Sequence, residues 1–197
     1  TNGQSPAEVL SFPEESAGSI RNVRTHANYS IGAASAKALE LDVETFTARC
    51  GVDRDTGAHY AAMDAMKVSL GDSFRWLSAL RSGQNAACGW LSAPKGIKLM
   101  EGVLHPGLVD SMLQVVMAAM PDTAGRSFVP FRIASWKCWK PLSVDSSMVF
   151  AQFREQNAHG RLSDLWVVDQ SGSVCMEVSG FELREVSADA IRHALSD

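Results

Sequence analysis

The most constraining feature of this sequence is a long apolar segment that starts at His105, HPGLVDSMLQVVMAAMPD. Pro106 suits the first turn of a helix, where its missing N–H costs nothing, and Pro121 ends the segment. The apolar side chains surround nearly the whole circumference of the predicted helix: Leu108, Val109, Met112, Leu113, Val115, Val116, Met117 and Met120. Because a helix that is apolar on most sides is buried on most sides, the sequence predicts a core helix inside a wrapping of other elements.

The segments around this helix have the composition of β-strands. Four strand-like runs follow it, separated by turn sequences: FVPFRIASWKCW, SSMVFAQFRE, RLSDLWVVDQ and SVCMEVSGFELREV. Upstream, two apolar runs on either side of residues 82–85 (SGQN) predict a hairpin, and Asp55 or Thr56 can cap a short helix at about 57–67. This spacing favours an antiparallel sheet over βαβ units, so the predicted fold class is α+β, with several strands around one apolar helix.

The beginning of the chain has less regular patterns. Residues 1–19 are rich in Ser, Pro, Gly and Glu without periodicity, which predicts a linker or disordered leader, and residues 20–197 are then the folded domain. Residues 19–36 favour one strand or two short ones. A strand-like alternation follows at Leu39, Leu41 and Val43.

Charge and composition limit the partners. The 197 residues include 18 Lys+Arg against 22 Asp+Glu, a formal net charge of -4, so neither nucleic acid nor an anionic membrane is indicated as a partner. No segment approaches the roughly 18 uninterrupted apolar residues of a membrane span, and the N-terminus lacks the features of a signal peptide. The cysteines are scattered without zinc-ligand spacing, which predicts no metal site and a reducing, cytoplasmic location: Cys50, Cys88, Cys138 and Cys175.

Two polar side chains one turn apart, Asp110 and Gln114, interrupt the apolar helix. A buried carboxylate is costly unless it is hydrogen-bonded or paired, and burial favours the protonated form, which makes Asp110 a candidate acid or base. The alternative is structural, because a carboxylate in the first turn of a helix that begins near Pro106 is favoured by the dipole and the free N–H groups. The local pattern alone favours this second interpretation. Likewise, His105 could pair with Asp110, but a role in the turn that enters the helix is the more ordinary one.

The helix segment GVLHPGLVDSMLQ, residues 102–114, resembles the HPxLxDxxxQ segment in the second half of polyketide synthase dehydratase domains. Upstream, ARCGVDRDTGAHYAAMDAMKVSLGDSFRWL resembles the short helix and GYxYGPxF loop of that half. Downstream, VPFRIASW and GSVCMEVSGFELREV resemble its later strands. The resemblance covers about residues 40–187 in register, and THANYSIG is similar to the last strand of the family's first half.

The resemblance implies a double hot-dog fold, in which each half wraps a curved antiparallel sheet around a long helix and the active site lies between the halves. Such domains remove water from a β-hydroxyacyl chain that an acyl carrier protein holds as a thioester on its phosphopantetheine arm, and they bind no cofactor of their own. The family's catalytic pair is a histidine in HxxxGxxxxP from the first half and the aspartate in DxxxQ or DxxxH from the second. Asp110 matches that aspartate, and the expected substrate-binding residues lie in the matched motifs: Gln114, His105, Pro106, Leu70 and Phe74.

The sequence also departs from the family pattern. None of its five histidines is followed by the HxxxGxxxxP spacing, so the usual base is missing. In the loop LGDSF, Leu70 replaces a usual Tyr and Asp72 a usual Pro, and Val68 occupies the other Tyr position. Dehydration needs a base at the α-carbon and an acid at the leaving hydroxyl, so one carboxyl group alone should perform it poorly.

Three hypotheses follow. The first is a dehydratase-like enzyme domain in a non-dehydrating role, such as chain branching by conjugate addition and lactone formation with a neighbouring ketosynthase. The second is a noncatalytic module that shapes the ketosynthase, docks the carrier protein or dimerises. The third is a conventional dehydratase whose first half lies outside the chain, which begins with Thr1 as a piece cut from a longer polypeptide would. A lone hot-dog half exposes apolar surface, so we also expect self-association or packing against another domain.

Overall fold

The structure is a computed structural model of the chain. It describes the following residues: 5–11, 24–32, 40–65, 69–100, 104–121, 123, 126–142, 144–156 and 160–187. The chain divides into two compact units, Thr1–Lys37 and Ala38–Asp197.

The first unit contains a two-stranded antiparallel sheet. Strand β1 (Ser5–Ser11) pairs with β2 (Arg24–Ile31), with a register shift after Val9. Strand β2 confirms the strand predicted within residues 19–36. Strand β1 corrects the expectation that residues 1–19 have no fold, because the hydrogen bonds of its ladder come from a partner later in the chain that local composition does not reveal.

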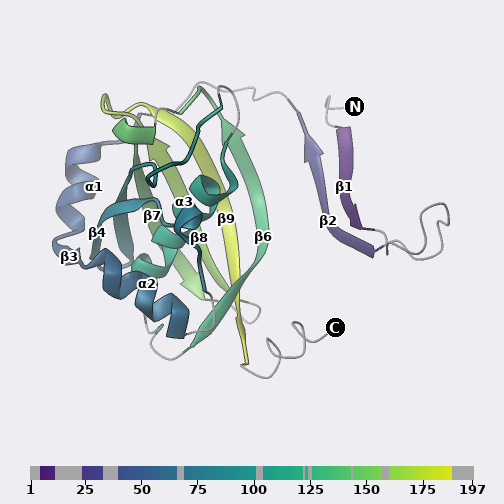
Figure 1. Cartoon of the computed structure of the whole chain (residues 1–197), viewed down its shortest axis with the longest axis horizontal. Helices are drawn as coiled ribbons and strands as arrows, with labels where there is room; N and C mark the ends of the chain where they lie inside the picture. The colour runs from purple at the N-terminus through teal and green to yellow at the C-terminus, as the bar shows by residue number, and fades with distance from the viewer. Residues whose placement is uncertain are drawn as a thin grey trace. The chain divides into compact units, whose positions relative to one another are not determined.

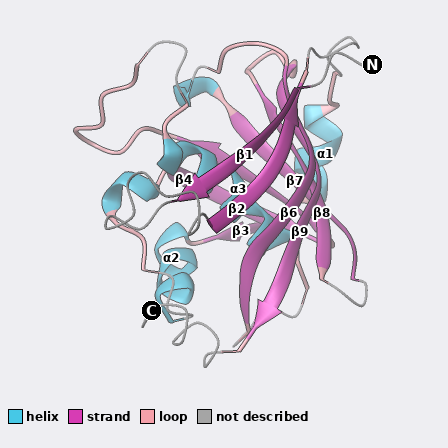
Figure 2. Ribbon diagram, turned by 90° about the vertical axis from the view of Figure 1, so that its right-hand side faces the viewer, coloured by secondary structure: helices cyan, strands magenta, loops and turns pink. Residues whose placement is uncertain are grey.

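The second unit is one seven-stranded antiparallel sheet with a helix inside it. Its strands lie in the order β3-β4-β5-β7-β8-β9-β6, so that β3 and β6 are the two edges (Figures 1 and 2). Its elements are, in chain order, α1 (Val43–Arg49), β3 (Val52–Arg54), α2 (Thr56–Ala65), the 3-10 turn η3 (Asp72–Phe74), β4 (Leu77–Gly83), β5 (Ala86–Leu91), α3 (Pro106–Ala119), β6 (Ser127–Cys138), the 3-10 turn η4 (Val144–Ser146), β7 (Met148–Gln156), β8 (Arg161–Val168) and β9 (Val174–Val186).

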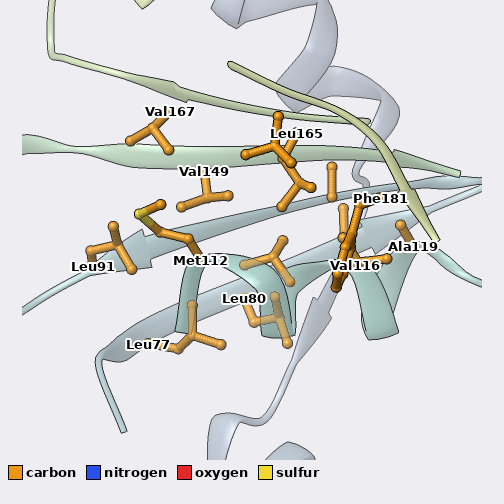
Figure 3. Packing of buried hydrophobic residues seen from close by; sticks show 14 of the residues in the cluster. Leu77, Leu80, Leu91, Met112, Val116, Ala119, Val149, Leu165, Val167 and Phe181 are labelled. Carbon is orange, nitrogen blue, oxygen red and sulfur yellow. The ribbon is translucent and has the colours of Figure 1, made fainter. Parts of the chain in front are cut away.

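Helix α3 lies in the curve of the sheet and carries the main core, as predicted. Of its 14 residues, only Pro106 is exposed. Figure 3 shows α3 side chains packed against residues from five strands: Met112, Val116 and Ala119 against Leu77, Leu80, Leu91, Val149, Leu165, Val167 and Phe181. A helix that is apolar nearly all round buries this surface by having strands on more than one side.

The other predicted elements are confirmed with one exception. Helix α2 occupies the predicted position, and the Asp55 carboxylate caps it by accepting a hydrogen bond from the Ala58 N–H at 2.6 Å. The hairpin β4–β5 turns at Asn85, which has a φ of 56°. The alternation that predicted a strand up to Val43 is wrong: Glu40 forms an isolated bridge with Ser173, and α1 begins at Val43 behind its N-cap Asp42.

Candidate functional site

The position of Asp110 in α3 tests the interpretation that it is a first-turn carboxylate. His105 is the N-cap and Pro106 the first helical residue, so Asp110 is the fifth residue and the first turn holds no acidic residue. The orphan N–H groups and the strongest effect of the dipole are confined to the first turn. The first-turn explanation of this carboxylate is therefore wrong, and its partner is a side chain.

That partner is Gln114, one turn further along the helix. Its Nε2 donates to Asp110 Oδ2 at 2.7 Å and also donates to the carbonyl oxygen of Phe74 at 3.2 Å. Gln114 is 4% exposed, while Asp110 is half-buried. A carboxyl group that is held by one buried donor and still reached by solvent has a fixed orientation and an accessible oxygen, which is what acid–base chemistry needs.

The turn η3 is bonded to the same side of α3. Ser111 Oγ donates to the Phe74 carbonyl at 3.0 Å and accepts from the Trp76 N–H at 3.1 Å. The Trp76 indole N–H donates to the Ser73 carbonyl at 2.7 Å. Ser111 and Trp76 are both fully buried. The loop that the resemblance assigns to the substrate is thus attached through its backbone to the helix that carries Asp110.

His105 has the structural role that the more ordinary interpretation predicts. Its Nδ1 accepts a hydrogen bond from the Gly107 N–H at 3.0 Å, which caps the helix. Its ring lies 5.2 Å, centre to centre, from the Trp76 ring. Pro106 follows as the exposed first residue of the helix. His105 and Pro106 thus lie at the N-terminal end of α3, one turn before Asp110.

Leu70 and Phe74 begin and end the loop next to Asp110. The Leu70 side chain packs against the main core, and its carbonyl accepts from Arg75 Nε at 3.0 Å. Phe74 is half-buried and contributes its carbonyl to Gln114. The structure therefore joins Phe74 to the helix through its backbone, while Leu70 packs against the main core.

Tyr60 is a neighbour of the site that sequence reasoning treated only as a helix-face residue. Its hydroxyl accepts from the Leu77 N–H at 3.1 Å, and burial raises the pKa of this phenol. The Arg75 guanidinium lies over its ring at 5.3 Å. The spacing of apolar residues on α2 indicates a buried Tyr60, but no local signal indicates its bond to the Leu77 N–H.

Two hollows in the surface of the second unit are lined by residues other than Asp110 and Gln114. A hollow of about 450 Å³ lies between α2 and the C-terminal end of α3, and burial lowers the pKa of His59 at its wall. A second, of about 490 Å³, lies beside Trp90 and Met148. Among the described residues, no group of three His, Cys, Asp or Glu side chains could hold a metal ion. In the same part of the chain, no helix is long and apolar enough to cross a membrane.

Comparison with known families identifies the chain. Residues 38–192 match the family described as polyketide synthase dehydratase N-terminal domain. The chain belongs to this family. The dehydratase-family domain also resembles polyketide synthase PksN of Bacillus subtilis, with 26% identity over 163 residues, which are 76% of this chain and 3% of that synthase.

Solved dehydratases share its hot-dog fold. An inactive histidine variant of the CurJ dehydratase in complex with a compound matches with a TM-score of 0.86 and 26% identity, over 97% of this chain and 67% of that one. An inactive aspartate-to-asparagine variant of the CurK dehydratase matches with a TM-score of 0.79 and 24% identity, over 96% of this chain and 65% of that one. The dehydratase-family domain thus spans about two thirds of the length of these dehydratases and a small part of a whole synthase.

Proposed function

We propose that this domain is the second hot-dog half of a dehydratase-like domain and acts on an acyl thioester that an acyl carrier protein holds on phosphopantetheine. The match of its motifs to HPxLxDxxxQ and to the preceding loop supports the second half, although the family's description names the N-terminal domain. The likeness to a modular synthase supports the carrier-bound substrate. The domain needs no cofactor of its own for this chemistry.

The observation that carries the proposal is the bonded pair of Asp110 and Gln114 on the core helix. In related domains, a histidine variant of the CurJ dehydratase and an aspartate variant of the CurK dehydratase are both inactive. This chain keeps the aspartate of the DxxxQ motif and has no histidine with the HxxxGxxxxP spacing. We infer that Asp110 is the catalytic residue of this domain and that the reaction uses it as an acid.

Conjugate addition has this requirement. A carbon nucleophile, generated by decarboxylation in a neighbouring ketosynthase, adds to the β-carbon of a carrier-bound α,β-unsaturated thioester. The electron pair of the double bond moves toward the thioester carbonyl, and the α-carbon then takes a proton. The Asp110 carboxyl group supplies that proton and takes one back from solvent. A hydroxyl of the branched product can then attack the thioester carbonyl: the lactone C–O bond forms, the C–S bond breaks, and the phosphopantetheine thiol leaves with the hydroxyl proton. We propose this branching role over ordinary dehydration because the loop LGDSF departs from the GYxYGPxF pattern of the dehydratases.

The remaining predicted site residues lie in the loop that is bonded to α3 and at the start of that helix. The side chains of Leu70 and Phe74 come from the loop on one side, and His105 and Pro106 from the start of the helix. We propose that they bind the acyl thioester, with Gln114 holding Asp110 in place. The departures of this loop from GYxYGPxF are consistent with a product different from that of a dehydratase.

We propose three partners: the acyl carrier protein, a neighbouring ketosynthase and a second copy of this chain. Self-association is supported by β6, an edge strand of 12 residues that exposes Phe131 (55%) and Ile133 (36%). Long edge strands with exposed apolar side chains promote association with another chain.

The test is intact-protein mass spectrometry of carrier proteins loaded with β-hydroxyacyl and α,β-unsaturated thioesters. Each is incubated with this domain, with and without the upstream ketosynthase and an extender-loaded carrier. We expect an adduct of extender and unsaturated chain that forms with the wild type and is lost with Asp110→Asn.

The other outcomes favour the alternatives. Loss of one water from the β-hydroxyacyl carrier, abolished by Asp110→Asn, would show a conventional dehydratase. An adduct that forms equally well with Asp110→Asn would leave a noncatalytic module, since the ketosynthase would then suffice. Either result would overturn the branching role.

A further inference from the structure

The carbonyl oxygen of Phe74 accepts hydrogen bonds from two side chains of α3. Ser111 Oγ lies at 3.0 Å and Gln114 Nε2 at 3.2 Å. The two donors are three residues apart and therefore lie on the same side of the helix. One backbone oxygen of the loop thus fixes two neighbouring side chains next to the carboxyl group of Asp110.

The amide of Gln114 can take only one orientation here. Its two N–H bonds serve two acceptors, the Phe74 carbonyl and Asp110 Oδ2. Its Oε1 is buried and has no hydrogen-bond partner among the described residues. Rotating the amide would place that oxygen against two other acceptors, so the side chain keeps both donor bonds and leaves its acceptor unused.

The direction of each proton in the neighbouring network is fixed too. The backbone N–H groups of Leu77 and Trp76 can only donate, the first to Tyr60 and the second to Ser111. The Ser111 hydroxyl then donates its proton to the Phe74 carbonyl. Because Ser111 is fully buried, accepts from one backbone N–H and has one carbonyl acceptor, its hydroxyl has one stable arrangement.

We propose that Ser111 is a positioning residue that, through the Phe74 carbonyl, holds Gln114 as a donor to Asp110 Oδ2 and thereby assigns proton transfer to Oδ1. Asp110 Oδ2 accepts a hydrogen bond from Gln114 Nε2 at 2.7 Å. A proton that Asp110 carries therefore resides on Oδ1. A carboxyl group with its proton always on the same oxygen presents it in one direction to the substrate. This inference rests on the proposed catalytic role of Asp110.

The test compares Ser111→Ala with Ser82→Ala in the full chain. Ser82 is also a buried serine, and its hydroxyl accepts from Arg54 on the β3–β4 pair, away from Asp110. The first readout is the NMR signal of the Gln114 side-chain amide. We expect the chemical shifts of both Gln114 amide protons to change in Ser111→Ala and to equal those of the wild type in Ser82→Ala. Ser111→Cys, which keeps the volume and a weak donor, gives an intermediate shift and covers the case in which Ser111→Ala does not fold.

The second readout is turnover of the carrier-bound α,β-unsaturated thioester with the ketosynthase and extender carrier. We expect Ser111→Ala to lower kcat about tenfold while KM changes less than about twofold, because a misplaced acid slows the reaction without weakening binding. Unchanged Gln114 signals, or a kcat equal to that of Ser82→Ala, would overturn the inference. Shifted Gln114 signals without any Asp110-dependent turnover in the wild type would support the positioning and reject the proposed function, so the two failures are distinguishable.

Discussion

Gly107, the second residue of α3, lies so close to the backbone of Ser73 that a Cβ atom on it would be 1.9 Å from the Ser73 carbonyl oxygen. The same atom would be 2.9 Å from the Trp76 indole nitrogen, which donates to that carbonyl. The absence of a side chain at Gly107 is therefore what allows the turn η3 to approach the helix and place the Phe74 carbonyl on Gln114.

Gly107→Ala is expected to lower the free energy of unfolding by about 1–3 kcal/mol, because the obstacle is backbone and the loop has to move. In an exposed helix the same change would be favourable. Gly71→Ala, at a position with nothing within 4 Å of the added atom, is the matched control and should leave stability within about 0.5 kcal/mol. Urea unfolding of both variants measures the difference, and equal stabilities would show that the close approach has no energetic consequence.

Gln114→Glu is expected to make stability depend on pH. The introduced carboxyl would face two acceptors, Asp110 and the Phe74 carbonyl, so its pKa is raised in the folded state. A raised folded pKa means that the variant loses stability as pH rises through that value, and it should be weakest relative to the wild type near pH 8, by about 1–3 kcal/mol. Urea unfolding near pH 5 and pH 8 measures this.

The double variant Asp110→Asn with Gln114→Glu is the control for that experiment. The new amide can donate to the new carboxylate, which restores one donor and one acceptor in the pair. Its stability near pH 8 should recover at least in part, while Asp110-dependent turnover stays absent. A double variant as unstable as the single one would argue against a direct bond between these positions.

The core helix and the pair on it could be predicted because their signals are local. Apolar residues around the whole helix indicated burial, and the spacing of Asp110 and Gln114 placed them on one face. The bonds to Phe74 could not be predicted, because its carbonyl is a backbone group 40 residues from Gln114 and its position depends on the packing of the loop. Sequence patterns identify side chains, but they do not show which backbone oxygen a fold brings to them.

Helix α1 was predicted wrongly because two local signals competed. The alternation that ends at Val43 favoured a strand, but Asp42 caps a helix by accepting from the Thr45 N–H at 3.0 Å and from the Thr45 hydroxyl at 2.7 Å. Behind this cap, Phe46 is buried against the outer face of the sheet. The cap at Asp42 and the burial of Phe46 together favour the helix. The alternating residues before it pair with another strand only at the Glu40–Ser173 bridge, so a strand there gains little.

His59 is expected to make the wild type less stable in mild acid. Burial lowers its pKa below the ordinary value of 6.5, so the unfolded chain binds a proton that the folded chain excludes. The resulting stability is fully present above about pH 6.5 and is lost as pH falls toward the lowered value. His59→Gln cannot gain this charge. Its free energy of unfolding should therefore fall less than that of the wild type when the pH is lowered from about 7.5 to about 5.5. Identical losses in urea unfolding would show that another group causes the pH dependence.

Self-association through β6 gives the last prediction, and the two edges of the sheet provide its control. Ile133 on β6 and Val52 on β3 are both exposed apolar side chains on edge strands, but β6 has 12 residues and β3 has three. A longer edge offers more backbone groups for pairing and more apolar area to cover. Ile133→Lys should therefore shift sedimentation of the chain toward the monomer, by about tenfold in dissociation constant, whereas Val52→Lys should leave it unchanged. If both lysine variants sediment as the wild type does, the second copy does not bind at β6; if Val52→Lys alone dissociates the chain, the association uses the opposite edge.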